Sequence, residues 1–138
     1  MRSKLETRNS LRKTMEPSTN YRLSFADVVY HGEGLFEVAA DNGIEVTVKM
    51  LGELTSLLDE LAPRPMKRAL LSNRKHSYSF SFEALPYAAR LKAVDAFAIQ
   101  AHSRITMVSA SIFKPLNFPF QVFLDRDEAI DWLRNRIT

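Results

Sequence analysis

The last part of the chain constrains the fold more than any other stretch of the sequence. An apolar run at 118–123 follows a proline-bounded loop, and Asp125 then opens an amphipathic segment that carries Trp132, the single tryptophan. Asp125 is a good N-cap. Acidic residues follow it in the first turn, and the last turn carries Arg134 and Arg136, which is the arrangement of charge that the helix dipole favours. A buried strand that leads directly into a capped helix is a building unit of α/β domains.

The same alternation of strand and helix runs through the rest of the chain. We expect strands at 21–30, 35–39, 69–71, 96–99 and 118–123, a brief extended piece at 44–46, and helices at 48–61, 82–92, 103–113 and 126–136. The first two strands flank a glycine-containing turn at 31–34 and predict an antiparallel hairpin. The predicted fold class is therefore α/β, a mixed sheet of about five strands that is largely parallel beyond the hairpin and is packed with four helices.

Capping residues set the expected helix limits. Residues 44–50 alternate like a strand, but leucines at helical spacing follow as far as Leu61. We therefore expect Thr47 to be the N-cap of a helix over this stretch. Ser81 is expected to cap the next helix, and Ser103 to open the third.

Composition excludes several classes of protein. The 138 residues suit one hydrophobic core. The absence of cysteine excludes disulfides, thiolate zinc sites and a cysteine nucleophile, and it suits the reducing cytoplasm, where we expect the protein to act. No apolar run approaches the roughly 18 residues that a membrane span needs, so no integral membrane segment is expected.

The net charge of +3 comes from the first 20 residues, which hold five basic and two acidic side chains. Residues 21–138 are neutral overall. We expect 1–20 to be a flexible basic leader and 21–138 to be a single domain; a leader that contacts anionic lipid or nucleic acid is the alternative. Because the domain itself lacks an excess of positive charge, no nucleic-acid partner is expected.

The last third of the chain also carries several short motifs. They are Ser103-Arg104, Ile112-Phe113-Lys114-Pro115, Pro119 and the run from Asp127 to Leu133. Together with the order of elements, these motifs resemble the SpoIIAA-like family, which is related to STAS domains and to the Sec14-type lipid-binding fold. The resemblance covers residues 96–133 and is only topological for 21–92. It implies a STAS-like sheet and indicates little about function.

STAS-type anti-sigma-factor antagonists resemble this layout and carry an Asp-Ser pair after the central strand, whose serine is phosphorylated. Here that place holds Ser77, Ser79 and Ser81, and none of them follows an aspartate. These serines are the candidate phosphorylation sites. Members of the family also often have an acidic residue at the end of the central strand, where this chain has Ser72-Asn73.

Polar residues gather after two predicted central strands, at the edge where open α/β sheets bind ligands. The helix N-termini expected there would favour an anion. The candidate ligand-binding residues are Asn73, Arg74, Ser77, Ser81, His102, Ser103 and Arg104, with Lys75 and His76 beside them. Ordinary capping and a solvated loop would produce the same pattern, so both interpretations stay open.

No pattern in the sequence indicates catalysis or a cofactor. His31, His76 and His102 are widely separated and no HExxH motif is present, so no metal site is expected. His102 and Ser103 are adjacent, which makes their side chains diverge, and they do not form a nucleophile–base pair. There is no GxGxxG motif and no P-loop.

Phenylalanines in the second half of the chain allow three interpretations. They are Phe80, Phe82, Phe97, Phe113, Phe118, Phe120 and Phe123. Alternating aromatic residues in strands usually form core. The Sec14 relationship implies instead a lipid cavity, and Phe118, Phe120 and Phe123 could mark a homodimer surface.

The sequence thus predicts a non-catalytic, STAS-like regulatory module that binds a protein partner, a second copy of itself or a small anionic ligand. The alternative is a small carrier or sensor of lipids or other apolar ligands, of the Sec14 type. An enzyme is the least favoured class.

Overall fold

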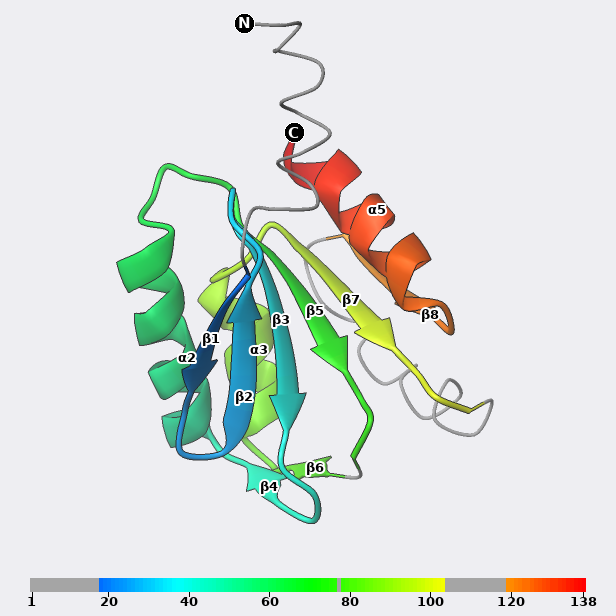
Figure 1. Ribbon diagram of the computed structural model, residues 1–138. Helices are drawn as coiled ribbons and strands as arrows, with labels where there is room; N and C mark the ends of the chain where they lie inside the picture. Colours follow the sequence, from blue (N-terminus) through cyan, green and yellow to red (C-terminus); the bar gives the residue numbers. More distant parts are fainter. Residues whose placement is uncertain (1–17, 77, 104–118) are drawn as a thin grey trace, which may run out of the picture.

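A six-stranded sheet forms the centre of the molecule (Figure 1). The structure, a computed structural model, describes residues 18–76, 78–103 and 119–138. In spatial order the strands are β1 (Thr19–Arg22), β2 (Ala26–Tyr30), β3 (Leu35–Ala40), β5 (Ala69–Asn73), β7 (Ala96–Gln100) and β8 (Phe120–Phe123). Strands β1, β2 and β3 pair antiparallel, whereas β3, β5, β7 and β8 pair parallel. The predicted α/β class is confirmed.

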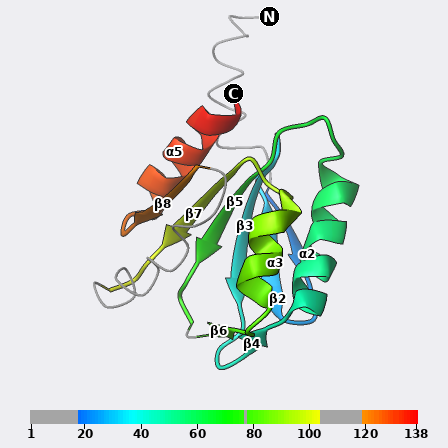
Figure 2. The ribbon, with the colours of Figure 1, turned by 180° about the vertical axis from the view of Figure 1, so that it is seen from behind.

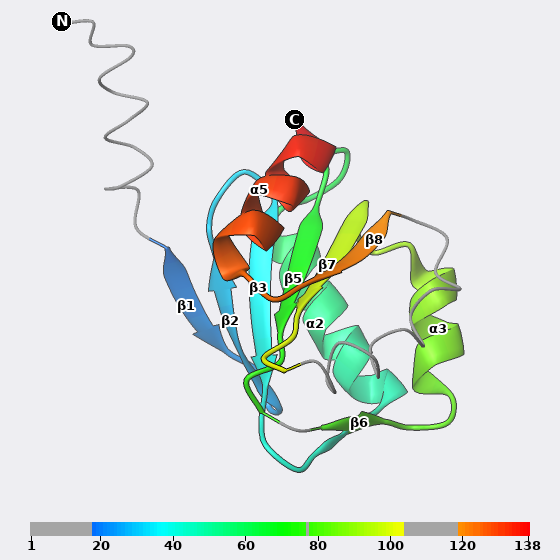
Figure 3. The same ribbon diagram turned by 90° about the vertical axis from the view of Figure 1, so that its right-hand side faces the viewer.

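Helices cover both faces of this sheet. Figure 2 shows α2 (Val48–Leu61) and α3 (Ala84–Leu91) side by side over one face, and Figure 3 shows α5 (Arg126–Ile137) over the other. Alternate strand residues supply the two cores: Phe36 and Leu70 face α2 and α3, while Leu35 and Leu71 face α5. The parallel strands are therefore buried on both sides.

Two predicted helix caps are confirmed. The Thr47 hydroxyl accepts a hydrogen bond from the Met50 N–H at 3.3 Å, at the start of α2. The Asp125 carboxylate accepts from the N–H groups of Asp127 at 2.8 Å and Glu128 at 3.2 Å, at the start of α5. Each cap satisfies donors that the first turn of a helix leaves without partners.

The N-terminal segment differs from the prediction of one strand at 21–30. It forms two antiparallel strands, β1 and β2, so the main sheet has six strands and not five. A tight turn separates them, in which the Leu23 N–H donates to the Ala26 carbonyl at 2.9 Å. The turn is held to α2, because the N–H of Ser24 donates to the Glu53 carboxylate at 3.0 Å. This contact with a distant helix left no pattern in the sequence.

The connection after β5 also differs from the prediction of a plain loop. Ser79–Phe80 forms β6, which pairs in parallel with β4 (Glu45–Val46). Ser81 was expected to cap α3, but the N-cap is Glu83, without a side-chain hydrogen bond. The Ser81 backbone is occupied instead, because its N–H donates to the Val46 carbonyl at 2.9 Å.

The described helices are α2, α3 and α5, whereas the sequence predicted four. The helix expected to open at Ser103 lies, apart from that residue, in 104–118, outside the described residues.

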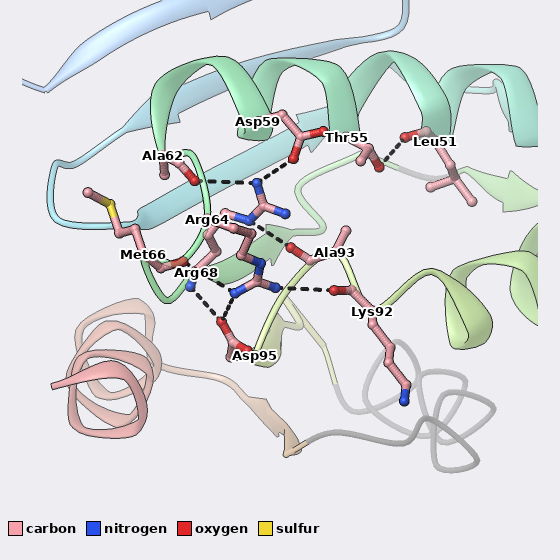
Figure 4. Close-up of polar contacts among 10 residues, drawn as sticks. All are labelled: Leu51, Thr55, Asp59, Ala62, Arg64, Met66, Arg68, Lys92, Ala93 and Asp95. Atoms are coloured by element: carbon pink, nitrogen blue, oxygen red, sulfur yellow. Dashed lines mark hydrogen bonds and ion pairs between the residues drawn. The ribbon is translucent and has the colours of Figure 1, made fainter.

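Two arginines join the end of α2 to the segment between α3 and β7 (Figure 4). Arg68 is only 3% exposed, and it donates to the Asp59 carboxylate at 2.7 Å, the Ala62 carbonyl at 3.4 Å and the Ala93 carbonyl at 2.9 Å. Arg64 donates to the Asp95 carboxylate at 2.6 Å. We call these six residues and Lys92, whose carbonyl accepts from Arg64, the arginine clasp. The clasp fixes the separation of α2 and α3 at this end of the molecule.

Candidate functional site

The structure brings together two of the predicted ligand-binding residues. Asn73 ends β5 and His102 follows β7, and His102 Nε2 lies 2.7 Å from Asn73 Oδ1. Arg74 turns to Tyr78, with its guanidinium carbon 4.7 Å from the centre of the ring. Ser103 is exposed.

Ser77 and Arg104 lie outside the described residues. The predicted crevice therefore contains Asn73 and His102 at one place, and Arg74 and Ser81 on the connection that leads to α3.

A buried carboxylate occupies this place, and the sequence analysis missed it. Glu37, on β3, is only 7% exposed. Arg126, the first residue of α5, donates to both of its oxygens, at 2.7 and 3.0 Å. Asn73 Nδ2 donates to Glu37 at 3.0 Å, and His31 Nε2 lies 3.0 Å from it. A lone acid in the apolar run Leu35–Ala40 was the available signal for a buried, paired charge.

These contacts set the charge state of Glu37. Burial raises the pKa of Glu37, but the hydrogen bonds from His31, Arg126 and Asn73, together with the positive charge of Arg126, lower it more, to well below its ordinary value of 4.5. The group therefore stays ionised. Because Glu37 already pairs with Arg126 through both oxygens, this guanidinium is not free to bind an anion beside Asn73 and His102.

We expect the variant Glu37→Gln to lose about 2 kcal/mol of unfolding free energy at pH 7, because hydrogen bonds to a charged group contribute roughly 1.5–3 kcal/mol. A pKa lowered in the folded state stabilises the fold above the ordinary pKa of 4.5, and this contribution is lost as the pH falls below that value. Urea denaturation of both proteins from pH 7 to pH 3 measures the effect. The difference in unfolding free energy between the wild type and the variant should become smaller as the pH falls. A difference that grows would contradict the assignment of Glu37 as an ionised, stabilising group.

The same network contains a serine–histidine–glutamate series. Ser18 Oγ lies 3.0 Å from Nδ1 of His31, whose Nε2 is 3.0 Å from Glu37. This connectivity is that of a hydrolase triad, in which the acid stabilises a transient imidazolium. Here Glu37 already neutralises the permanent charge of Arg126 through both oxygens. The geometry is better explained as a structural anchor of β3 to α5.

An apolar cavity lies on the opposite face of the sheet, between α2 and α3. Its volume is about 110 Å³. It is lined by Phe25, Val38, Ala40, Val46, Leu51, Leu54, Thr55, Leu58, Leu70, Ser72, Tyr78, Phe80, Ala88, Ala93, Val94 and Phe97. The hydroxyl groups in this wall are paired: Thr55 donates to the Leu51 carbonyl at 2.9 Å, and the hydroxyls of Ser72 and Tyr78 are 2.8 Å apart. The wall is thus apolar in character.

The phenylalanines do not form one surface. Phe80 and Phe97 line the cavity, whereas Phe82 is 94% exposed. Phe120 stacks on Phe97 with ring centres 5.6 Å apart. Phe123 packs at 5.8 Å against Trp132, which is partly buried against the core under α5. Phe113 and Phe118, also named as cavity or dimer candidates, lie outside the described residues.

Neither a metal centre nor a membrane span is present in the described part of the chain. Over residues 18–76, 78–103 and 119–138, no cluster of three or more His, Cys, Asp or Glu side chains is placed to hold a metal ion. Over the same ranges, no helix is long and apolar enough to cross a membrane.

Comparison with solved structures identifies the architecture. An uncharacterized protein of the DUF3478 family with a SpoIIAA-like fold, from Shewanella loihica PV-4, is similar to this chain with a TM-score of 0.52 and 17% sequence identity. The similarity covers 85% of this chain and 92% of that chain. The fold is SpoIIAA-like. No protein-family model matches the sequence, and neither does any curated protein.

The SpoIIAA-like fold confirms the resemblance drawn from the motifs, at the level of architecture. The candidate phosphorylation sites Ser79 and Ser81 lie on the connection from β5 to α3. Ser79 is exposed in β6, whereas the hydroxyl oxygen of Ser81 is buried. Ser77 lies outside the described residues. Of the two described serines, Ser79 is therefore the one whose side chain is accessible to solvent.

Proposed function

We propose that this protein is a non-catalytic, STAS-like binding module whose ligand is a small apolar molecule held between α2, α3 and the sheet. The observation that carries the proposal is the apolar cavity of about 110 Å³ between the two helices. It favours the alternative that the sequence left open, a carrier or sensor of lipids and other apolar ligands.

The cost of the cavity supports a functional role. An apolar wall that is not packed against other atoms forgoes hydrophobic and dispersion stabilisation, so an unfilled space of about 110 Å³ is a cost to the fold. Domains of this size are stable by only about 5–15 kcal/mol, and their interiors are otherwise close-packed. A ligand that fills the space would recover much of this energy and would stabilise the protein by mass action.

The other face of the sheet supports the non-catalytic part of the proposal. The series Ser18–His31–Glu37 is the best candidate for an acid–base centre among the described residues, and Arg126 neutralises its acid. The pairing of Arg126 with Glu37 leaves that guanidinium unavailable to an anion, so a small anion beside Asn73 is the weaker of the two ligand hypotheses.

Native mass spectrometry of protein purified from its own host tests the proposal. We expect a species that carries a small molecule, which denaturation releases. A defined homodimer or a complex with another protein, with no bound small molecule, would instead support the interaction module and overturn the apolar-ligand proposal.

Filling part of the cavity should weaken ligand binding without unfolding the protein. Ala88 lines the cavity from α3, so we expect Ala88→Leu to weaken the binding of 1-pentanol at least tenfold, because added methylene groups take the ligand's place. NMR titration of methyl signals in the cavity wall measures the affinity. Ser56, exposed on α2, provides the control, and Ser56→Leu should bind 1-pentanol like the wild type. Equal binding by the wild type and Ala88→Leu would place the ligand elsewhere.

A further inference from the structure

A groove with partly exposed apolar side chains lies between α5 and β8, at the edge of the sheet. Leu124 and Trp132 line it, and Trp132 is only partly buried where it packs on Phe123, with ring centres 5.8 Å apart. Leu124 is 50% exposed and is one of three large apolar side chains that are exposed among the described residues. Apolar side chains that gather at a groove are typical of an interaction surface, whereas scattered ones are not.

One side of α5 carries an acid, an aromatic ring and a base in that order along the groove. Glu128, Trp132 and Arg136 follow one another at intervals of four residues, so they lie on the same side of the helix. The guanidinium carbon of Arg136 is 4.8 Å from the centre of the Trp132 ring. Glu128 and Arg136 are exposed, and neither forms an ion pair with another residue that the structure describes. We call these three residues the α5 stripe.

The order of charges along the α5 stripe is self-complementary. In a dimer with a two-fold axis near Trp132, the second α5 runs antiparallel to the first, which places Arg136 of each copy beside Glu128 of the other. The two Trp132 rings then meet at the axis, and tryptophan and arginine are enriched among the residues that contribute most to interfaces. A parallel arrangement would instead place like charges side by side. The stripe therefore fits an antiparallel copy of itself.

We infer that the α5 stripe and Leu124 form the interface of a homodimer in which the two α5 helices run antiparallel. The occupant of the groove is a second copy of this chain, because the acid–aromatic–base order matches its own reverse. Helix α5 covers the face of the sheet opposite α2 and α3, so the dimer leaves the apolar cavity uncovered (Figures 2 and 3). The inference goes beyond the proposed function and does not depend on it.

Charge reversal on the α5 stripe tests the inference. Analytical ultracentrifugation over a range of protein concentrations measures the dissociation constant of the dimer. We expect the wild type to dimerise, and Glu128→Arg and Arg136→Glu each to raise this constant about tenfold or more, because symmetry repeats the repulsive contact at both ends of the interface. The double variant with both changes restores opposite charges and should dimerise like the wild type. Glu60→Arg makes the same change in charge at an exposed residue of α2 and should leave the constant unchanged.

Trp132 provides a second readout, because it is the single tryptophan of the chain. Its fluorescence emission should shift to longer wavelength as dilution separates the two copies and exposes the ring. A wild type that stays monomeric up to about 1 mM overturns the inference and leaves the groove to a different partner. A dimer that survives both single reversals unchanged, or that the double variant does not restore, also overturns it, because the copies then meet through another surface. None of these outcomes tests the apolar cavity, so the two proposals fail separately.

Discussion

Replacing Gly34 with alanine is expected to remove about 4 kcal/mol or more of unfolding free energy, a loss typical of the most damaging substitutions. Gly34 has φ +85°, a conformation that residues with a side chain rarely adopt, and an added Cβ would lie 2.1 Å from the Lys67 carbonyl oxygen. The Lys67 carbonyl cannot easily move away, because the backbone two residues later is fixed. There the Ala69 N–H donates to the Gly34 carbonyl at 2.9 Å, where the pairing of β3 with β5 begins. Urea denaturation measures the loss.

Gly43 provides a matched control for this substitution. Its φ is +80°, close to that of Gly34, but nothing lies within 4 Å of an added Cβ. Gly43→Ala should therefore show only the conformational cost, about 1–2 kcal/mol. Similar losses in the two variants would mean that Gly34 and Lys67 are not packed as the structure places them.

The second large effect is expected at Arg68, where Arg68→Met should cost about 2–4 kcal/mol, because two carbonyl groups beside this buried side chain lose their donor and each such loss costs about 1–3 kcal/mol. Methionine fills a similar volume but leaves the carbonyls of Ala62 and Ala93 without their donor and releases Asp59 (Figure 4). Thermal and urea unfolding of the variant measure the loss.

Arg64→Met tests whether burial causes the effect at Arg68. Arg64 makes comparable contacts, to Asp95 and to the Lys92 carbonyl, but its side chain is 39% exposed. Water can replace these contacts, so we expect a loss of about 1 kcal/mol. A larger loss at Arg64 than at Arg68 would contradict the assignment of Arg68 as the centre of the arginine clasp.

Local patterns in the sequence were sufficient for the class of fold. Asp125 and Thr47 cap their helices as expected, because capping depends on residues within one turn. The parallel arrangement followed from single strands that alternate with helices. The split of β1 from β2 was not predicted, because the turn at Ser24 is held by Glu53 from α2.

Structure that depends on distant contacts was beyond sequence patterns. Strands β4 and β6 contribute only two residues each to their pairing. Strands of two residues are too short to show a periodic pattern of apolar residues. It also occupies the backbone of Ser81 and displaces the expected cap to Glu83.

The candidate site was predicted only in part. Asn73 and His102 meet because the ends of parallel strands lie at one edge of a sheet. Glu37 and Arg126 are 89 residues apart, and the sequence alone did not pair them. The cavity depends on the separation of α2 and α3, which the arginine clasp fixes at one end, and no motif encodes that distance.

A crystal structure of the protein under xenon pressure tests most directly whether the space between α2 and α3 accepts a ligand, since xenon enters apolar cavities of this kind. We predict a xenon atom in contact with Leu54, Leu70 and Phe97, with the two helices in place. A structure in which the side chains of α2 and α3 close onto the sheet and no xenon lies beneath the helices would contradict the proposed binding site.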